Sequence, residues 1–251
     1  MSTWVLLRGL AREARHWGGF RGRLAHHVRG ELVVAVDLPG NGLRWRDASP
    51  TRLAAAMELV RSELAAAGHR PPYRLVALSL GAMAAVQWAS AHPREVGGSV
   101  LINTSFGRFS PPWRRLRPAA MAQLGGLLLR GAPALERESC ILRITSNFPV
   151  DAAVARAWAD HAITSPVSRV NMLRQVMAAA SFRAPAQAPA VPLLLLASRR
   201  DRLVSVECSR AIARAWQVKL EVHPDAGHDL PLDDPGWVIE RILGWRAAHL
   251  F

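Results

Sequence analysis

Six short runs of apolar residues recur along the chain, and each is stopped by glycine, proline or a polar residue. The runs cover residues 4–10, 31–40, 74–81, 99–105, 191–198 and 220–225. Short, mostly continuous apolar runs are typical of strands that are buried on both faces of a parallel sheet. The pattern therefore predicts a mostly parallel sheet of about six strands.

Stretches with apolar residues three or four positions apart lie between these runs and predict helices over residues 17–28, 50–67, 79–91, 204–216 and 235–248. The second stretch shows the spacing best, with one apolar face formed by Leu53, Met57, Val60 and Leu64. Asp234, directly before Pro235, is expected to cap the last helix. Strands that alternate with helices predict an α/β fold of the doubly wound type.

One long interval breaks this alternation, because no strand pattern occurs between residues 105 and 191. It contains apolar helical stretches at 118–130, 149–162 and 166–181, followed by a Pro/Ala linker at 184–192. The last helix is expected to return the chain to the sheet. We therefore predict a core formed by residues 1–105 and 166–251, and a helical cap inserted over residues 106–165.

Length and composition indicate one large globular domain with an insertion. The chain has 251 residues, of which 50% are hydrophobic. Its two cysteines, Cys140 and Cys208, form no disulfide framework and suit a reducing compartment. No apolar run approaches the roughly 18–20 residues of a membrane helix, and the first residues lack the pattern of a signal peptide. A cytoplasmic protein is expected.

The formal net charge is +13, and all but one of the 32 basic residues are arginines. Residues 107–183 carry +7 of this charge. The excess has two interpretations, which are a GC-rich coding sequence and an acidic partner or substrate attracted by the basic field. No zinc-finger spacing, RNP motif or basic heptad region occurs, so nucleic acid is not an expected partner.

The strongest chemical signal is A-L-S-L-G at residues 77–81, directly after a strand run and before a helix. In this setting the chain turns sharply and Ser79 projects above the sheet, which is the nucleophile elbow. The usual motif is G-x-S-x-G, and here Ala77 takes the place of the first glycine. The alternative interpretation of Ser79 is a helix N-cap.

A serine nucleophile needs a base and a group that orients the base. Asp201 follows the strand at 191–198 and His228 follows the strand at 220–225, so both lie where open α/β sheets place their sites. We predict that His228 takes the proton of Ser79 and that Asp201 orients the imidazole. The backbone N–H groups of Leu10 and Leu80 are the predicted oxyanion donors.

Neither a His/Cys/Asp cluster with metal spacing nor a glycine-rich phosphate loop is present, so no metal or cofactor is expected.

These residues add up to a resemblance to the α/β-hydrolase superfamily over nearly the whole chain. L-R-G-L-(x)6-W at 7–17 resembles its oxyanion loop, and D-L-P-G-N-G at 37–42 resembles its D-x-P-G-x-G loop with Asn41 in the usual His place. The resemblance implies the strand order 4-3-5-6-7-8, without the first two strands of larger members, and a cap after the sixth family strand. It also suggests Arg8, Gly9 and Trp17 as substrate-binding residues.

Arg8 stands where many members have histidine. It could reach an anionic substrate or hydrogen-bond loop carbonyls as a structural part.

The expected activity is that of a serine hydrolase on a carboxylic ester or thioester with an apolar acyl part, through an acyl-enzyme. The alternatives are an acyltransferase, a perhydrolase or a C–C hydrolase on the same triad, or a non-catalytic ligand-binding protein. Within the superfamily the chain is similar to small capped esterases of the kind that act on pimeloyl-acyl-carrier-protein methyl esters. That similarity implies a further partner, an acidic acyl carrier protein docked on the Arg-rich cap.

Overall fold

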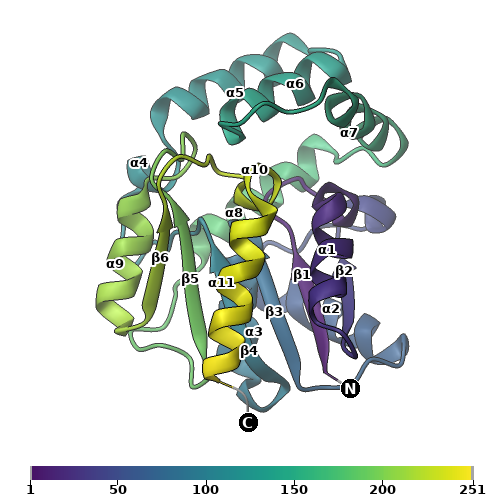
Figure 1. Cartoon of the computed structure of the whole chain (residues 1–251). Helices are drawn as coiled ribbons and strands as arrows, with labels where there is room; N and C mark the ends of the chain where they lie inside the picture. Colours follow the sequence, from purple (N-terminus) through teal and green to yellow (C-terminus); the bar gives the residue numbers. More distant parts are fainter. Residues whose placement is uncertain (1, 250–251) are drawn as a thin grey trace.

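A single parallel sheet forms the centre of the molecule (Figure 1). The computed structural model describes residues 2–249, apart from the side chain of Leu128. The strands are β1 (Thr3–Leu7), β2 (Leu32–Val36), β3 (Tyr73–Leu78), β4 (Val96–Ile102), β5 (Leu193–Ser198) and β6 (Lys219–His223). Their order is β2-β1-β3-β4-β5-β6, and every neighbouring pair is parallel. With the family's first two strands left out, β1 to β6 stand for family strands 3 to 8, and this order is the predicted 4-3-5-6-7-8. The predicted α/β class and strand order are confirmed.

Helices cover both faces of the sheet. Helices α1 (Gly19–His27) and α11 (Pro235–Ala248) pack on one face, and α2 (Leu53–Ala66), α3 (Leu80–Ala91) and α9 (Val206–Trp216) pack on the other. Along β1, Trp4 and Leu6 belong to the core cluster on the side of α1 and α11, whereas Val5 and Leu7 belong to the cluster on the side of α2, α3 and α9. Successive strand residues point to opposite faces, which explains why the strand runs are apolar throughout.

Five helices occupy the interval between β4 and β5. They are α4 (Pro112–Arg115), α5 (Pro118–Arg130), α6 (Ala134–Thr145), α7 (Ala152–Thr164) and α8 (Arg169–Ser181). Figure 1 shows α5, α6 and α7 above the carboxyl ends of the strands, with α8 beneath them. The helices predicted at 118–130, 149–162 and 166–181 match α5, α7 and α8. The division of the chain into a core and a cap over residues 106–165 stays a prediction.

The remaining elements are short. They are α10 (Leu230–Asp233) and the 3-10 turns η1 (Ala14–Trp17), η2 (Gly42–Arg44) and η3 (Pro93–Glu95). Within residues 2–249, no helix combines the length and the apolar character needed to cross a membrane.

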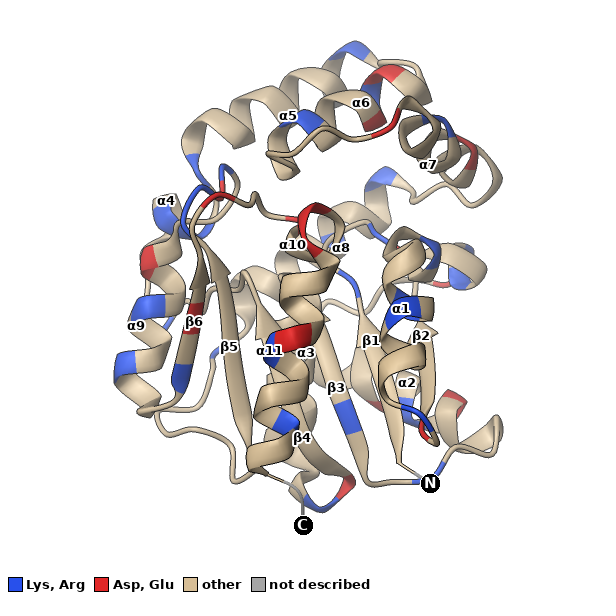
Figure 2. Ribbon diagram, viewed as in Figure 1, with Lys and Arg blue, Asp and Glu red and all other residues tan. Residues whose placement is uncertain are grey.

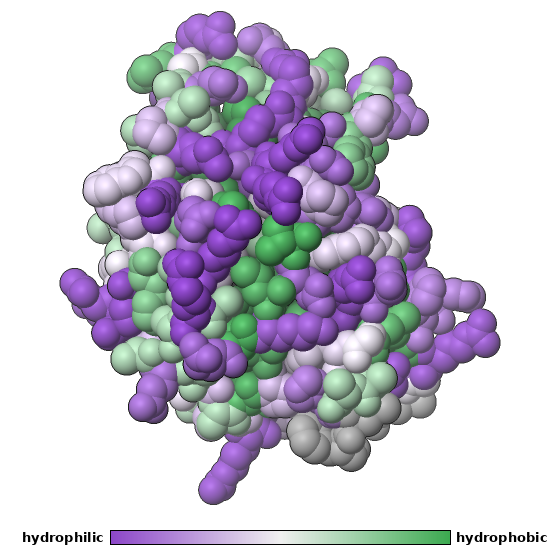
Figure 3. Space-filling model, turned by 60° about the vertical axis from the view of Figure 1, so that its left-hand side comes forward, coloured by the Kyte–Doolittle hydropathy of each residue, from purple (hydrophilic) through white to green (hydrophobic). Residues whose placement is uncertain are grey.

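Basic residues occur on many elements, including α4, α9 and the helices above the sheet (Figure 2). The α9 side of the molecule carries many hydrophilic side chains around a narrower hydrophobic strip (Figure 3). Five arginines at or near α4 and the end of α8 form no salt bridge among the described residues, and they are Arg108, Arg114, Arg115, Arg117 and Arg183. We call them the arginine patch. The patch leaves positive charge at the surface that no carboxylate of the described chain neutralises.

Candidate active site

Ser79 occupies a strained turn between β3 and α3. Its backbone angles are φ 57° and ψ −115°, a region that residues other than glycine rarely adopt. Two bonds fix the turn: Ser79 N–H donates to the carbonyl of Ile102 at 2.9 Å, and Thr104 Oγ1 donates to the carbonyl of Ser79 at 3.0 Å. The side chain makes no N-cap bond to α3. The strain is therefore held by the neighbouring strand end, as a nucleophile elbow requires.

The close approach of α3 to the end of β1 explains why the motif has glycine at position 81. A Cβ atom at this position would lie 2.4 Å from the carbonyl oxygen of Leu7 and 2.6 Å from that of Arg8. Both distances are far below normal van der Waals contact, and both oxygens belong to backbone that cannot swing away. Only glycine lets the first turn of α3 pass so close to the end of β1.

Asp201 and His228 form a buried pair beyond the ends of β5 and β6. Asp201 Oδ2 lies 2.7 Å from His228 Nδ1, and the two residues are only 2% and 5% exposed. The other carboxylate oxygen accepts the N–H groups of Leu203 at 2.7 Å and Val204 at 2.9 Å. The carboxylate is thus fixed in its own loop and holds one ring nitrogen of His228. The second ring nitrogen, Nε2, has no hydrogen-bond partner among residues 2–249.

Asn103, which the sequence analysis did not single out, supports this pair. It follows β4, has φ 44°, and is buried. Its Nδ2 donates to the carbonyl of His228 at 2.8 Å and to Ser198 Oγ at 3.0 Å, while its Oδ1 accepts Ser198 N–H at 2.8 Å. Asn103 therefore ties the end of β4 to the end of β5 and to residues 224–229, the loop after β6 that carries His228 and is called the histidine loop below. A polar residue directly after a buried strand was the signal available in the sequence.

Ser79, Asp201 and His228 all lie at the carboxyl edge of the sheet. The loop after β1 connects them, because Gly9 lies against Ser79 and Arg8 binds Asp229, the neighbour of His228. A Cβ at Gly9 would be 3.2 Å from Cβ of Ser79. The hydrogen bonds of the described residues include the Asp201–His228 pair but none on the Ser79 hydroxyl.

The predicted oxyanion donors belong to the two segments that meet at Ser79. Leu80 is the first residue of α3, and Leu10 follows Gly9 in the loop after β1. Neither backbone N–H group has a hydrogen-bond partner within residues 2–249. Two free N–H groups beside a candidate nucleophile are what a developing oxyanion needs.

Arg8 and Trp17 lie inside the protein. Arg8 donates two hydrogen bonds to the carboxylate of Asp229, at 3.0 and 2.5 Å, and its guanidinium lies 5.0 Å from the centre of the Trp17 ring. The two residues are 3% exposed each, and Trp17 packs in the core on Phe20. Arg8 thus binds a carboxylate in place of the loop carbonyls considered above. Its position joins the loop after β1 to the histidine loop.

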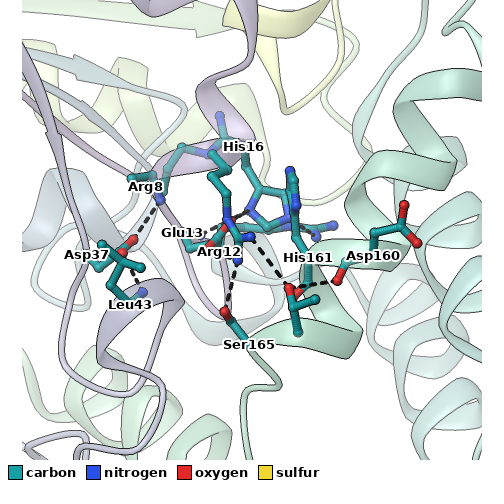
Figure 4. A network of polar contacts seen from close by, with 12 residues as sticks. Arg8, Arg12, Glu13, His16, Asp37, Leu43, Asp160, His161 and Ser165 are labelled. Carbon is teal, nitrogen blue, oxygen red and sulfur yellow. Dashed lines mark hydrogen bonds and ion pairs between the residues drawn. The ribbon is translucent and has the colours of Figure 1, made fainter.

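The rest of the loop after β1 contacts the helices above the sheet (Figure 4). Arg12 Nη1 lies 2.5 Å from Glu138 Oε2 on α6 and 3.1 Å from His16 Nε2, and its guanidinium stacks on Trp158 of α7. His16 Nδ1 accepts Glu13 N–H at 3.1 Å. Burial, with Arg12 close by, holds the pKa of His16 well below its usual range. The imidazole is therefore neutral at neutral pH.

Asp37 joins two loops at the carboxyl edge of the sheet. Asp37 accepts the N–H groups of Ala14 at 2.7 Å and Leu43 at 2.9 Å, while burial raises its pKa. It therefore fastens the loops after β1 and β2 to each other. Among residues 2–249, no group of three His, Cys, Asp or Glu side chains is arranged to hold a metal ion.

Comparisons with known proteins agree with this fold. Residues 4–241 match the alpha/beta hydrolase family. The chain is 29% identical over 233 residues to the pimeloyl-[acyl-carrier protein] methyl ester esterase of Methylococcus capsulatus, covering 84% of this chain and 80% of that protein. Two similar solved structures are an esterase from Exiguobacterium antarcticum (TM-score 0.77, 13% identity, 98% of this chain and 91% of that chain) and a thermophilic esterase from Thermogutta terrifontis (TM-score 0.74, 21% identity, 100% and 91%).

Proposed function

The chain belongs to the alpha/beta hydrolase family and is a hydrolase of that fold, and from this premise we propose that it cleaves carboxylic esters or thioesters with Ser79 as nucleophile. The family inferred from the motifs is thereby confirmed, whereas the roles of individual residues are part of the proposal. The observation that carries it is the buried Asp201–His228 pair at 2.7 Å, on the sheet edge that also bears the strained Ser79.

In the first half of the proposed reaction, Ser79 Oγ attacks the carbonyl carbon of the substrate. His228 Nε2 takes the hydroxyl proton, and Asp201 stabilises the imidazolium that forms. The carbonyl oxygen becomes an oxyanion and accepts the N–H groups of Leu10 and Leu80. The tetrahedral intermediate then collapses, the bond to the leaving group breaks, and His228 returns the proton to the departing alcohol or thiol. The acyl group remains on Ser79.

In the second half, water takes the place of the leaving group. His228 removes a proton from the water while its oxygen attacks the acyl carbon. The second tetrahedral intermediate releases the carboxylic acid, and the proton held by His228 returns to Ser79 Oγ. Each step uses groups of the chain and water only.

The experiment that tests this proposal is hydrolysis of nitrophenyl esters from acetate to dodecanoate by the wild type and by Ser79→Ala. We expect a burst, steady turnover, and a loss of at least about a thousandfold in kcat in the variant, since removal of the nucleophile leaves only binding and the oxyanion site. A fluorophosphonate probe should label Ser79 in the wild type alone. Turnover that survives in a folded Ser79→Ala variant would contradict the assignment.

The arginine patch supports a narrower part of the proposal, in which the ester is carried on an acidic acyl carrier protein. Arg108, Arg115 and Arg183 line a surface hollow of about 490 Å³ whose lining contains no acidic residue. A relative with 29% identity bears the name of an esterase for a carrier-bound methyl ester. Unpaired cations on one surface attract an acidic protein over a distance set by ionic strength.

Carrier docking is tested by charge reversal at exposed patch residues. We expect Arg114→Glu combined with Arg183→Glu to raise KM for a carrier-bound ester while leaving the hydrolysis of a free nitrophenyl ester unchanged. The same KM should rise with salt in the wild type. The matched control reverses two exposed arginines outside the patch, Arg29 and Arg70. An equal effect of the control pair, or a KM that does not depend on salt, would count against docking on the patch.

A further inference from the structure

The turn after β1, residues 9–12, begins at Gly9, which lies against Ser79, and carries the Leu10 amide as the next one along the chain. Ala11 has φ 52°, a left-handed conformation that is unfavourable for a residue with a Cβ. The one internal bond of the turn joins Arg12 N–H to the carbonyl of Gly9 at 3.2 Å. A strained turn persists only where surrounding groups fix it.

Gln175 on α8 holds the turn by one hydrogen bond. Its Oε1 accepts the N–H of Ala11 at 2.9 Å, across 164 positions of sequence. Gln175 is 4% exposed, so this bond lies away from bulk solvent. The amide that it binds belongs to the residue directly after the proposed oxyanion donor Leu10.

The side chain of Gln175 is itself held in one orientation. Its Nε2 donates to Asn41 Oδ1 at 3.0 Å and to Ser49 Oγ at 3.2 Å. Because the NH₂ group is occupied on that side, the carbonyl oxygen must face Ala11. Asn41 belongs to the D-L-P-G-N-G segment, for which the catalytic proposal gave no role, and it is fully buried.

Side chains of α6 and α7 also contact the turn, at Arg12. Arg12 binds Glu138 at 2.5 Å and stacks on Trp158 with 4.8 Å between its Cζ and the ring centre. The Arg12 and Glu138 side chains are 12% and 5% exposed. Figure 4 shows Arg12 among the residues that connect the loop after β1 with α7. The turn is therefore held at Ala11 from α8 and at Arg12 from α6.

We propose that Gln175, oriented by Asn41, and Glu138, acting through Arg12, are positioning residues that hold the turn of residues 9–12 so that the Leu10 amide faces the oxyanion. The inference rests on the proposed function, since it concerns the oxyanion site of that reaction. Neither side chain needs to touch the substrate. The helices between β4 and β5 thus contribute to catalysis through the backbone of the loop after β1.

The test measures kcat and KM of Gln175→Leu and Glu138→Leu with a nitrophenyl ester. Both substitutions displace the oxyanion donor without removing it. We therefore expect kcat to fall by about tenfold or more while KM changes by less than about threefold. The affinity for an alkyl boronic acid, which forms a tetrahedral adduct on Ser79, should fall by the same factor as kcat. Gln175→Glu keeps an acceptor for Ala11 N–H and should recover part of kcat.

Matched controls separate positioning from loss of structure. Asn171→Leu removes an equally buried amide one turn earlier on α8, where it binds Ser49 N–H and the carbonyl of Asp47. Glu136→Leu removes an exposed acid of α6 that lies 3.7 Å from Arg130. Both controls should keep kcat in the folded protein. An unchanged kcat in folded Gln175→Leu, or an equal loss in Asn171→Leu, would overturn the proposal.

A readout without ester turnover keeps the two proposals distinct. Amide hydrogen exchange over residues 9–12 should accelerate in Gln175→Leu and stay unchanged in Asn171→Leu. If the wild type cleaves no ester, the proposed function fails, and the rate of fluorophosphonate labelling of Ser79 then decides the inference. Slower labelling in Gln175→Leu supports positioning, and an unchanged labelling rate or unchanged exchange overturns it. A wild type that is neither active nor labelled overturns both.

Discussion

Gly81 shows how little space separates the start of α3, next to the candidate nucleophile, from the end of β1. A methyl group there would have to displace the carbonyl oxygens of Leu7 and Arg8, which lie 2.4 and 2.6 Å from its position. We expect Gly81→Ala to lower the free energy of unfolding by several kcal/mol, on the order of other overpacked sites, and to abolish esterase activity. Denaturant unfolding and ester turnover measure the two effects.

The control for this substitution is another glycine within a helix. A Cβ at Gly244 of α11 would meet no atom within 4 Å. Gly244→Ala should therefore raise the free energy of unfolding by up to about 1 kcal/mol, because alanine is the better helix former. Tolerance of Gly81→Ala at wild-type stability would contradict the close approach of α3 to β1.

His16 makes the free energy of unfolding depend on pH. Burial and the nearby Arg12 lower its pKa in the folded protein, whereas an unfolded chain binds the proton near pH 6.5. Below that pH the unfolded state binds more protons, so the free energy of unfolding falls as the pH is lowered, by at most about 1.4 kcal/mol per pH unit for one group. Above pH 6.5 the contribution is constant. Urea unfolding between pH 7.5 and 5 measures this slope.

His16→Gln removes the titrating group and keeps a polar side chain at the position. We expect a shallower decline of stability toward pH 5 in this variant. His26→Gln on the exposed face of α1 is the control and should leave the slope as in the wild type. An identical slope in His16→Gln and the wild type would show that His16 does not carry the dependence.

At the element scale, the features set by local pattern were predictable from the sequence. Strands β1 to β6 followed from apolar runs, and the turn at Ser79 followed from small residues between a strand and a helix. Helix α6 was missed because its first half, A-L-E-R-E-S, is mostly charged or polar, and its apolar residues Ile141, Leu142 and Ile144 gather near its end. Glu138 lies in that helix. Its burial is explained by the ion pair with Arg12, which only the folded structure brings next to it.

The structure confirms the predicted N-cap of α11. Asp234 is the N-cap residue, and its Oδ1 accepts Trp237 N–H at 2.9 Å. We expect Asp234→Ala to lower the free energy of unfolding by about 1 kcal/mol, the usual effect of losing a cap, while kcat is kept. Glu240→Ala, on the exposed side of the same helix, is the control and should change stability by less than about 0.5 kcal/mol. Equal effects in the two variants would contradict a capping role.

The arrangement of the site depends on contacts between segments that are far apart in the sequence. Arg8 and Asp229 are separated by 221 positions, and Ala11 and Gln175 by 164. No local pattern predicts such partners, because each depends on how the sheet and the helices above it are assembled. The positions of Ser79, Asp201 and His228 at the carboxyl ends of strands were predictable, and their catalytic roles stay a proposal, whereas the groups that hold their loops were not predictable.

Asp233 is one of the contacts between the segment after α6 and the histidine loop. Its carboxylate accepts Gly227 N–H at 2.6 Å and Asn147 N–H at 3.0 Å, and Ser146 Oγ also donates to it. A neighbouring backbone bond runs from Asp229 N–H to the carbonyl of Thr145 at 2.7 Å. One side chain thus fixes the segment after α6 to the segment that carries His228.

We expect Asp233→Ala to loosen both segments together, so that amide exchange rises over residues 145–147 and 225–229 at once and kcat falls about tenfold or more through the orientation of His228. The control, Asp160→Ala, removes an exposed acid of α7 and should alter neither quantity. If exchange rose at residues 145–147 alone and kcat stayed at the wild-type value, the helices above the sheet would move independently of the histidine loop, and Asp233 would be a contact without influence on the site.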